Sequence, residues 1–120
     1  MAVRGMRGAT SVGANDPRAI EEAVRELLGR IVSENRVAIE EVASAFFTST
    51  PDLDADFPAR AARQMGWGAV PLMCAQEIGV PRAPARIVRV LLLVNTDLAQ
   101  RDVRHVYLGE AARLRPDLAQ

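Results

Sequence analysis

Residues 86–95 place the tightest constraint on the fold, because they form the most apolar segment of the chain. The unbroken apolar run from Val90 to Val94 is far shorter than the roughly 20 residues that a membrane span needs, and it suits a strand. Side chains alternate along a strand, so both faces of this one carry large aliphatic residues that need burial. The sequence therefore predicts a sheet that is covered on both sides.

One long amphipathic helix is predicted to cover one of these faces. Asp16 followed by Pro17 supplies an N-cap carboxylate and a proline at the first helical position. Because a single helix cannot cover both faces, we expect the other face to meet another copy of the chain in a closed symmetric oligomer. Apolar residues at the helical spacing continue the helix to about Asn35, and they are Ile20, Ala23, Val24, Leu27, Leu28, Ile31 and Val32.

Shorter elements are predicted to surround this helix and strand. Pro51 stops one strand, Pro71 places another at an edge or bulge, and a helical turn precedes Pro116. Together the elements predict one α+β domain over residues 1–120, a mixed sheet packed with one long and shorter helices. The further strands are expected over residues 2–12, 42–50, 70–74 and 104–108, and the short helix runs from Pro58 to about Met65.

Composition and charge narrow the class of protein. Hydrophobic residues make up 49% of the chain, which excludes disorder. The 15 basic residues, all arginine, balance 15 acidic ones, so the basic surplus of a typical nucleic-acid binder is missing. The first twenty residues hold no apolar block, and the single cysteine, Cys74, indicates a reducing compartment. We expect a small cytoplasmic domain that binds neither nucleic acid nor a membrane.

An arginine interrupts the apolar strand. Arg89 shares a strand face with Ile87 and Leu91, where an isolated charge costs several kcal/mol unless an opposite charge and hydrogen bonds compensate it. One interpretation is structural: an ion pair with an acid such as Glu77 or Glu110, or a strand that is more exposed than its composition suggests. The other is a guanidinium placed for an anionic ligand, because its fork of donors fits a carboxylate. The spacing alone leaves both open.

Three more arginines stand in notable places. Arg7 lies between Gly5 and Gly8, and glycine within a strand often marks close approach by a ligand or another chain. An ordinary edge-strand arginine beside a bulge would show the same pattern. Arg60 and Arg63 lie three residues apart on one face of the short helix, where solvated side chains are also common. These positions are compatible with electrostatic binding of an anion.

Other chemistries have little support in the sequence. Cys74 and His105 are the only thiol and the only imidazole; they could form a nucleophilic pair, although packing accounts for each more simply. A zinc site needs three or four nitrogen or sulfur ligands, which the chain can hardly supply. The glycines fit neither a dinucleotide loop nor a Walker loop. What remains is an enzyme that works by arginine electrostatics alone, or a binder of a small anion.

Five blocks of sequence, in order and without large gaps over about residues 3–118, carry a family resemblance. They are RGMRGAT at 4–10, TPDL at 50–53, FPARA at 57–61, RHVYL at 104–108 and LRPDL at 114–118. In these blocks the chain resembles the monofunctional trimeric chorismate mutases. The resemblance implies a mixed sheet packed with helices, a homotrimer with a pseudo-α/β-barrel core, and an active site in each of three subunit-interface clefts.

The resemblance also implies a reaction, the Claisen rearrangement of chorismate to prephenate in phenylalanine and tyrosine biosynthesis. No metal, cofactor, proton transfer or covalent intermediate is needed. The substrate must fold into a chair-like conformer, and holding that conformer removes part of the entropic barrier. Negative charge grows on the ether oxygen as the C–O bond breaks, so a fixed cation beside it stabilises the transition state.

Residue roles follow from the same resemblance. Arg89 would donate to the ether oxygen and to a carboxylate, while Arg7 would grip the enolpyruvyl carboxylate together with Tyr107. Glu77 and Cys74 would hold the ring hydroxyl. The remaining matches are Phe57 and Ala59 as an apolar wall from the neighbouring chain, Arg60 (where lysine is common) and Arg63 near the mouth, Met73 where threonine is common, and Leu114 and Arg115 closing over the site.

Two other classes of function stay open at this point. A small trimeric enamine/imine deaminase would also use an interface arginine, although its own sequence blocks are not recognisable here. A non-catalytic trimer could bind an aromatic or dicarboxylate metabolite. Such a binder needs only a carboxylate clamp, whereas the mutase also needs a donor at the ether oxygen, so Arg89 and Glu77 discriminate between these functions.

Overall fold

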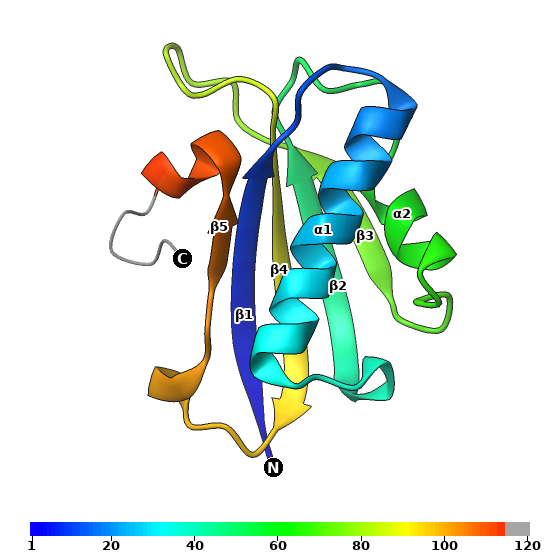
Figure 1. The fold of residues 1–120 in the computed structure, drawn as a ribbon, viewed down its shortest axis with the longest axis vertical. Helices are drawn as coiled ribbons and strands as arrows, with labels where there is room; N and C mark the ends of the chain where they lie inside the picture. The colour runs from blue at the N-terminus through cyan, green and yellow to red at the C-terminus, as the bar shows by residue number, and fades with distance from the viewer. Residues whose placement is uncertain (115–120) are drawn as a thin grey trace.

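A five-stranded mixed sheet and a layer of helices make up the chain in the computed structural model, which describes residues 1–114 (Figure 1). Arg115, predicted to close over the site, and Pro116, predicted to follow a helical turn, therefore lie outside the described residues. No helix within residues 1–114 has both the length and the apolar character that crossing a membrane requires. The strands are β1 (Ala2–Ser11), β2 (Val42–Ser49), β3 (Leu72–Gln76), β4 (Ile87–Thr96) and β5 (Val106–Leu108).

The sheet has the order β3-β2-β4-β1-β5, which places the most apolar strand at its centre. β4 pairs antiparallel with both β1 and β2, while the outer strands β3 and β5 run parallel to their neighbours. This pairing confirms the predicted mixed sheet and the α+β class. The helical elements are α1 (Pro17–Asn35), α2 (Pro58–Gln64) and three short 3-10 turns, η1 (Ile39–Glu41), η2 (Gln100–Asp102) and η3 (Gly109–Arg113).

Helix α1 has the bounds that its sequence signals predict. The Asp16 carboxylate accepts a hydrogen bond from the backbone N–H of Ala19 at 2.9 Å, and Pro17 opens the first turn. The helix ends where Arg36 adopts a left-handed conformation with φ of 52°. The apolar stripe packs on one face of the sheet, and α2 lies beside α1 over β2 and β3 (Figure 1).

The two faces of the sheet differ in how far they are covered. On the helix side, Val88, Val90, Leu92 and Val94 of β4 are all buried. On the other side, Ile87 is buried with Ala9, Tyr107 and Ala111 beneath η3. The rest of that face is open, and we refer to it as the open face. Its exposed large side chains include Phe46, Met73 and Leu91.

Two strands begin two residues later than predicted, for reasons that lie elsewhere in the fold. The Pro71 carbonyl accepts the Ala45 N–H at 3.0 Å, and β3 starts only after this proline, at the predicted sheet edge. β5 starts at Val106 because the peptide groups of Arg104 bind a side chain instead of a neighbouring strand. Asn35, at the end of α1, accepts the Arg104 N–H and donates to the Arg104 carbonyl, both at 2.8 Å.

The contact between α1 and β1 depends on a glycine and can be tested. A Cβ added to Gly8 would lie 2.6 Å from Cδ1 of Ile31 and 3.0 Å from Cδ1 of Leu27, inside a filled core. We expect Gly8→Val to lower the free energy of unfolding by about 1–3 kcal/mol in a urea titration, because overpacking strains both elements. Gly29→Ala is the control. Gly29 lies in α1, as Leu27 and Ile31 do, but has open space around it, so this substitution should raise the free energy of unfolding by about 1 kcal/mol. Equal stability of Gly8→Val and wild type would contradict this packing.

Candidate active site

A recess of about 380 Å³ lies on the open face where β1, β2, β4 and β5 come together. Strand pairing places Arg89 beside Ala9 of β1 on one side and Thr48 of β2 on the other. Arg7 pairs with Leu91 in the same way. The recess is lined by Arg7, Gly8, Phe46, Thr48, Arg89, Val90, Leu91 and Tyr107. Two guanidinium groups therefore face a largely apolar hollow.

Arg89 is held by a carboxylate. Its Nε donates to Oε2 of Glu77 at 3.0 Å, and the Thr48 hydroxyl donates to the same oxygen at 2.8 Å. The Glu77 backbone is fixed in turn, because its N–H donates to the Ser49 carbonyl at 2.9 Å. Glu77 is thus the partner acid, while Glu110 pairs with Arg113 on η3.

The ion pair with Glu77 leaves part of the Arg89 guanidinium available to a ligand. The Arg89 side chain is 42% exposed, whereas that of Glu77 is 16% exposed. Within residues 1–114, Arg89 makes no ion pair with any other residue, so donors of its guanidinium face the recess. The two interpretations left open by the sequence are therefore combined: Arg89 is in an ion pair and remains accessible to a ligand.

Arg7 and Tyr107 complete this group. The Arg7 guanidinium has no hydrogen bond or ion pair within the described part of the chain, although its backbone N–H donates to Nδ1 of His105 at 3.0 Å. Tyr107 is buried except for 5% of its surface, and its hydroxyl has no partner among residues 1–114. An anion in the recess would thus meet two donors that the described chain leaves unoccupied.

The segment TPD, within one of the family-like blocks, fixes the start of β4 just before Arg89. The Thr50 hydroxyl accepts the Ile87 N–H at 3.1 Å, and the Asp52 carboxylate accepts the Arg86 N–H at 2.9 Å. Partial burial alone would raise the pKa of Asp52. Hydrogen bonds from Thr50, from the amide of Asp52 and from Arg86, together with the charge of Arg86, lower this pKa below its ordinary value.

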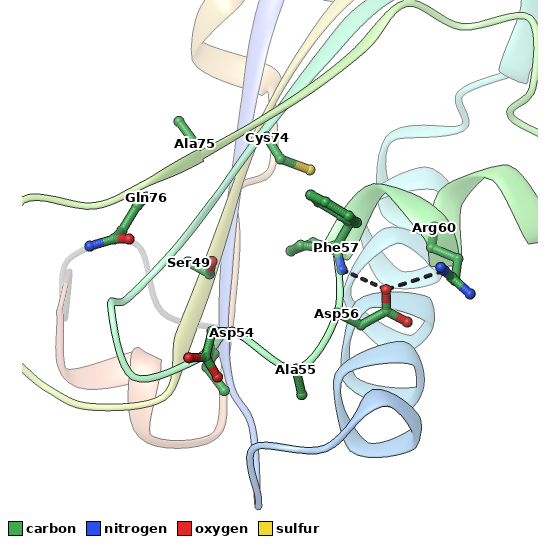
Figure 2. Close-up of a pocket in the computed structure, with 11 residues that line it drawn as sticks. Ser49, Asp54, Ala55, Asp56, Phe57, Arg60, Cys74, Ala75 and Gln76 are labelled. Carbon is green, nitrogen blue, oxygen red and sulfur yellow. Dashed lines mark hydrogen bonds and ion pairs between the residues drawn. The ribbon is translucent and has the colours of Figure 1, made fainter.

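A second group of predicted site residues lies elsewhere, beside α2. Phe57, Ala59, Arg63 and Cys74 line a recess of about 310 Å³ together with Leu72. The Cys74 side chain is directed toward the Phe57 ring (Figure 2). A neighbouring hollow of about 490 Å³ includes Arg60, whose Nε lies 3.2 Å from the Asp56 carboxylate.

A single chain does not bring the two groups together. Cys74 pairs with Phe47, whose side chain is buried on the helix side, whereas Glu77 binds Arg89 on the open face. The predicted sharing of a ring hydroxyl by Glu77 and Cys74 is therefore not met within one protomer, because residues alternate along β3. Met73, which precedes Cys74 and pairs with Phe46, is 61% exposed on the open face.

The predicted alternative of a Cys–His pair is wrong for a single chain. Cys74 lies on β3 at one edge of the sheet, and His105 precedes β5 at the opposite edge. No group of three or more His, Cys, Asp or Glu side chains within residues 1–114 is arranged to hold a metal ion. Leu114 packs against the cluster that contains Tyr107, while Arg115 lies outside the described residues.

Sequence reasoning missed Thr48. It lies within the strand predicted over residues 42–50, but nothing local indicated that its hydroxyl would meet a carboxylate 29 residues later in the chain. Phe46 and Leu91, which form the apolar wall of the recess, were likewise seen only as strand residues. The pairing of β2 with β4 is what makes these three side chains part of the site.

Comparisons with known proteins agree on one family. The family described as chorismate mutase type I matches residues 3–118. A chorismate mutase AroH of Thermus thermophilus is 53% identical over 117 residues, covering 97% of this chain and 96% of that protein. The chorismate mutase AroH of Bacillus subtilis is 42% identical over 120 residues, covering 99% and 94%. A solved chorismate mutase from Clostridium thermocellum has a TM-score of 0.90 and 42% identity, covering 91% of this chain and 97% of its own.

The structural value of the ion pair can be measured separately from any binding role. We expect Glu77→Gln to lower the free energy of unfolding by less than about 1 kcal/mol, because the partly exposed Arg89 keeps access to water. The exposed pair of Arg18 and Glu22 provides the control Glu22→Gln, with a similarly small effect. Urea unfolding of both variants gives the comparison. A loss of about 3 kcal/mol or more for Glu77→Gln would show that the pair is a buried structural element.

Proposed function

We propose that Arg89, Arg7 and Glu77 are the catalytic residues of this chain, which belongs to the chorismate mutase type I family. It is a chorismate mutase, an isomerase of aromatic amino acid biosynthesis. The three residues would convert chorismate to prephenate by conformer selection and electrostatic stabilisation. The observation that carries this proposal is the accessible guanidinium of Arg89, held by Glu77 within an apolar recess. Membership of this family decides against the two alternative functions, the enamine/imine deaminase and the non-catalytic binder.

Substrate binding is proposed to begin with the carboxylates. Chorismate carries two of them, and the recess offers two guanidinium groups against the one carboxylate of Glu77. The Arg7 guanidinium, which has no partner among the described residues, would take the enolpyruvyl carboxylate, and the Tyr107 hydroxyl would donate to it as well. Phe46 and Leu91 would limit the orientations of the ring and so help to hold the chair-like conformer.

Arg89 is proposed to act on the bond that breaks. As the C–O bond lengthens, negative charge grows on the ether oxygen, and a cation already fixed beside it stabilises the transition state more than the ground state. Glu77 and Thr48 would keep the guanidinium in place, so little reorganisation is needed during the reaction. Once a neighbouring chain closes the recess, its apolar walls would strengthen this interaction because they would exclude water from it.

A second copy of the chain is proposed to close the recess, in a homotrimer with a pseudo-α/β-barrel core. The recess on the open face lacks Phe57, Ala59, Arg63 and Cys74, which line a separate hollow beside α2. Supplied by a neighbour, these residues would add an apolar wall, a further cation and a thiol near the ring hydroxyl. The exposed Phe46, Met73 and Leu91 of the open face would then be covered. Leu114 and Arg115 would close over the bound substrate.

The whole of residues 1–120 is proposed to act as one domain in the cytoplasm. The match to the family over residues 3–118 supports a single unit, and the free thiol of Cys74 supports a reducing compartment. No second functional unit is needed for the reaction. The only small molecule implied is the substrate, since the residues in the recess would provide the binding and the charge stabilisation by themselves.

The role of Arg89 is tested by a substitution that keeps its charge. Arg89→Lys removes the fork of donors, and we expect kcat/KM for chorismate to fall by at least about 100-fold, the usual effect of losing a transition-state donor. The loss of chorismate absorbance in the presence of a chelator gives the rate. Arg101→Lys, exposed on η2, is the control and should match wild type. A near-normal kcat in Arg89→Lys would remove Arg89 from the mechanism, and no acceleration by the wild-type protein would refute the proposed reaction.

The shared cleft is tested by mass and by complementation. Light scattering should give about three times the 13.0 kDa of one chain. Arg89→Ala and Arg63→Ala damage different halves of the proposed site, so each alone should be weakly active. Co-refolding them in equal amounts should restore about a quarter of the clefts, because that fraction joins two intact halves. A stable monomer, or no recovery on mixing, would contradict the shared cleft.

A further inference from the structure

We propose that His105 is a positioning residue for Arg7, and that it acts by accepting the Arg7 backbone N–H at Nδ1. The distance between the two nitrogens is 3.0 Å. This inference rests on the proposed function, in which the Arg7 side chain binds a substrate carboxylate. It adds a residue that does not line the recess and would not touch the substrate, but that would set where the arginine enters the site.

The imidazole extends the pairing of β1 with β5 by one position. The parallel pairing begins at Gly8 with Val106 and continues at Ala9 with Tyr107 and Thr10 with Leu108. Arg7 precedes this pairing, so its N–H faces β5 with no strand residue as partner. Nδ1 of His105 provides the acceptor that a carbonyl would provide within a regular ladder.

The hydrogen bond also fixes the protonation of the ring. A nitrogen that accepts an N–H carries no proton, so the neutral imidazole holds its proton on Nε2. His105 thus acts here as an acceptor at one defined atom. An asparagine side chain could place its Oδ1 oxygen in a comparable position, whereas alanine or leucine has no acceptor.

The position of His105 is set in turn by Asn35, whose side chain binds both backbone groups of the preceding residue, Arg104. The Asn35 side chain donates to the carbonyl of Arg104 and accepts its N–H, both at 2.8 Å, and also donates to the carbonyl of Ile31 at 3.0 Å. Asn35 is buried, and these side-chain hydrogen bonds are all to backbone groups. Hydrogen bonds at Arg104 and at His105, joined by the peptide link between these two residues, therefore connect the end of α1 to the amide of Arg7.

The bond to His105 anchors Arg7 on the β5 side of β1. The buried Met6 and the pairing with β4 hold the strand elsewhere, while the Arg7 guanidinium has no partner within residues 1–114. Because Gly8 follows directly, the Arg7 backbone can still shift on its β5 side when that bond is lost. Losing the hydrogen bond to His105 would let the Arg7 side chain enter the recess in more than one position. The cost would appear mainly in substrate binding.

The test compares His105→Ala with His105→Asn in chorismate turnover. We expect His105→Ala to raise KM by about tenfold, the effect of losing about one hydrogen bond, with a smaller change in kcat. His105→Asn, which keeps an acceptor, should stay within about twofold of wild type. A wild-type KM in His105→Ala, or equal defects in both variants, would overturn the proposal. If His105→Ala does not fold, His105→Leu replaces it, because it fills the space without an acceptor.

A double-mutant cycle separates this proposal from the proposed function. If His105 acts through the Arg7 side chain, His105→Ala should add no further rise in KM to an Arg7→Ala background. Independent, additive effects would overturn the positioning role. A normal KM in Arg7→Ala would refute the assignment of Arg7 in the proposed function and this inference with it. A raised KM in Arg7→Ala with a normal KM in His105→Ala would overturn the inference alone.

Discussion

The contact between Arg89 and Glu77 is the interaction on which the site depends. Arg89 lies in the central and most apolar strand, where its partial exposure keeps its charge in reach of water. One oxygen of Glu77 accepts from Arg89 at 3.0 Å and from the Thr48 hydroxyl at 2.8 Å, and so fixes the direction of the guanidinium. Thr50 and Asp52 fix the chain that enters this strand. The result is a guanidinium with a defined direction and accessible donors. These are the properties that the proposed electrostatic mechanism requires.

The two faces of the sheet have different roles: one packs against the helices and forms the core, and the other carries the recess. The helix side of β4 is filled by α1, whereas the open face keeps Phe46 and Leu91 exposed beside Arg7 and Arg89. The residues beside α2 that the family resemblance assigned to the same site lie across the sheet from them. A closed oligomer would satisfy both observations, because it covers the open apolar surface and completes the recess in one step.

Local signals predicted much of the fold. The N-cap carboxylate of Asp16 and the apolar spacing that follows gave α1 its observed bounds, because capping and helical periodicity act within four residues. The alternation in β4 separated its residues into two faces, and the structure shows that Val88, Val90, Leu92 and Val94 form the buried face on the helix side. The starts of β3 and β5 were predicted two residues early. β5 is shortened by Asn35, which binds Arg104 across 69 positions of sequence, and no local pattern indicates such a contact.

The sequence by itself determined the long helix, the central apolar strand with Arg89 as an exception to its pattern, and the resemblance that suggested the reaction. Only the tertiary structure decided that the counter-charge of Arg89 is Glu77 and not Glu110, and that Cys74 faces away from it. It also joined the amide of Arg7 to His105, 98 residues away. The reason is physical: periodicity and caps are local properties of a chain, whereas partners across a sheet are chosen by strand order and register.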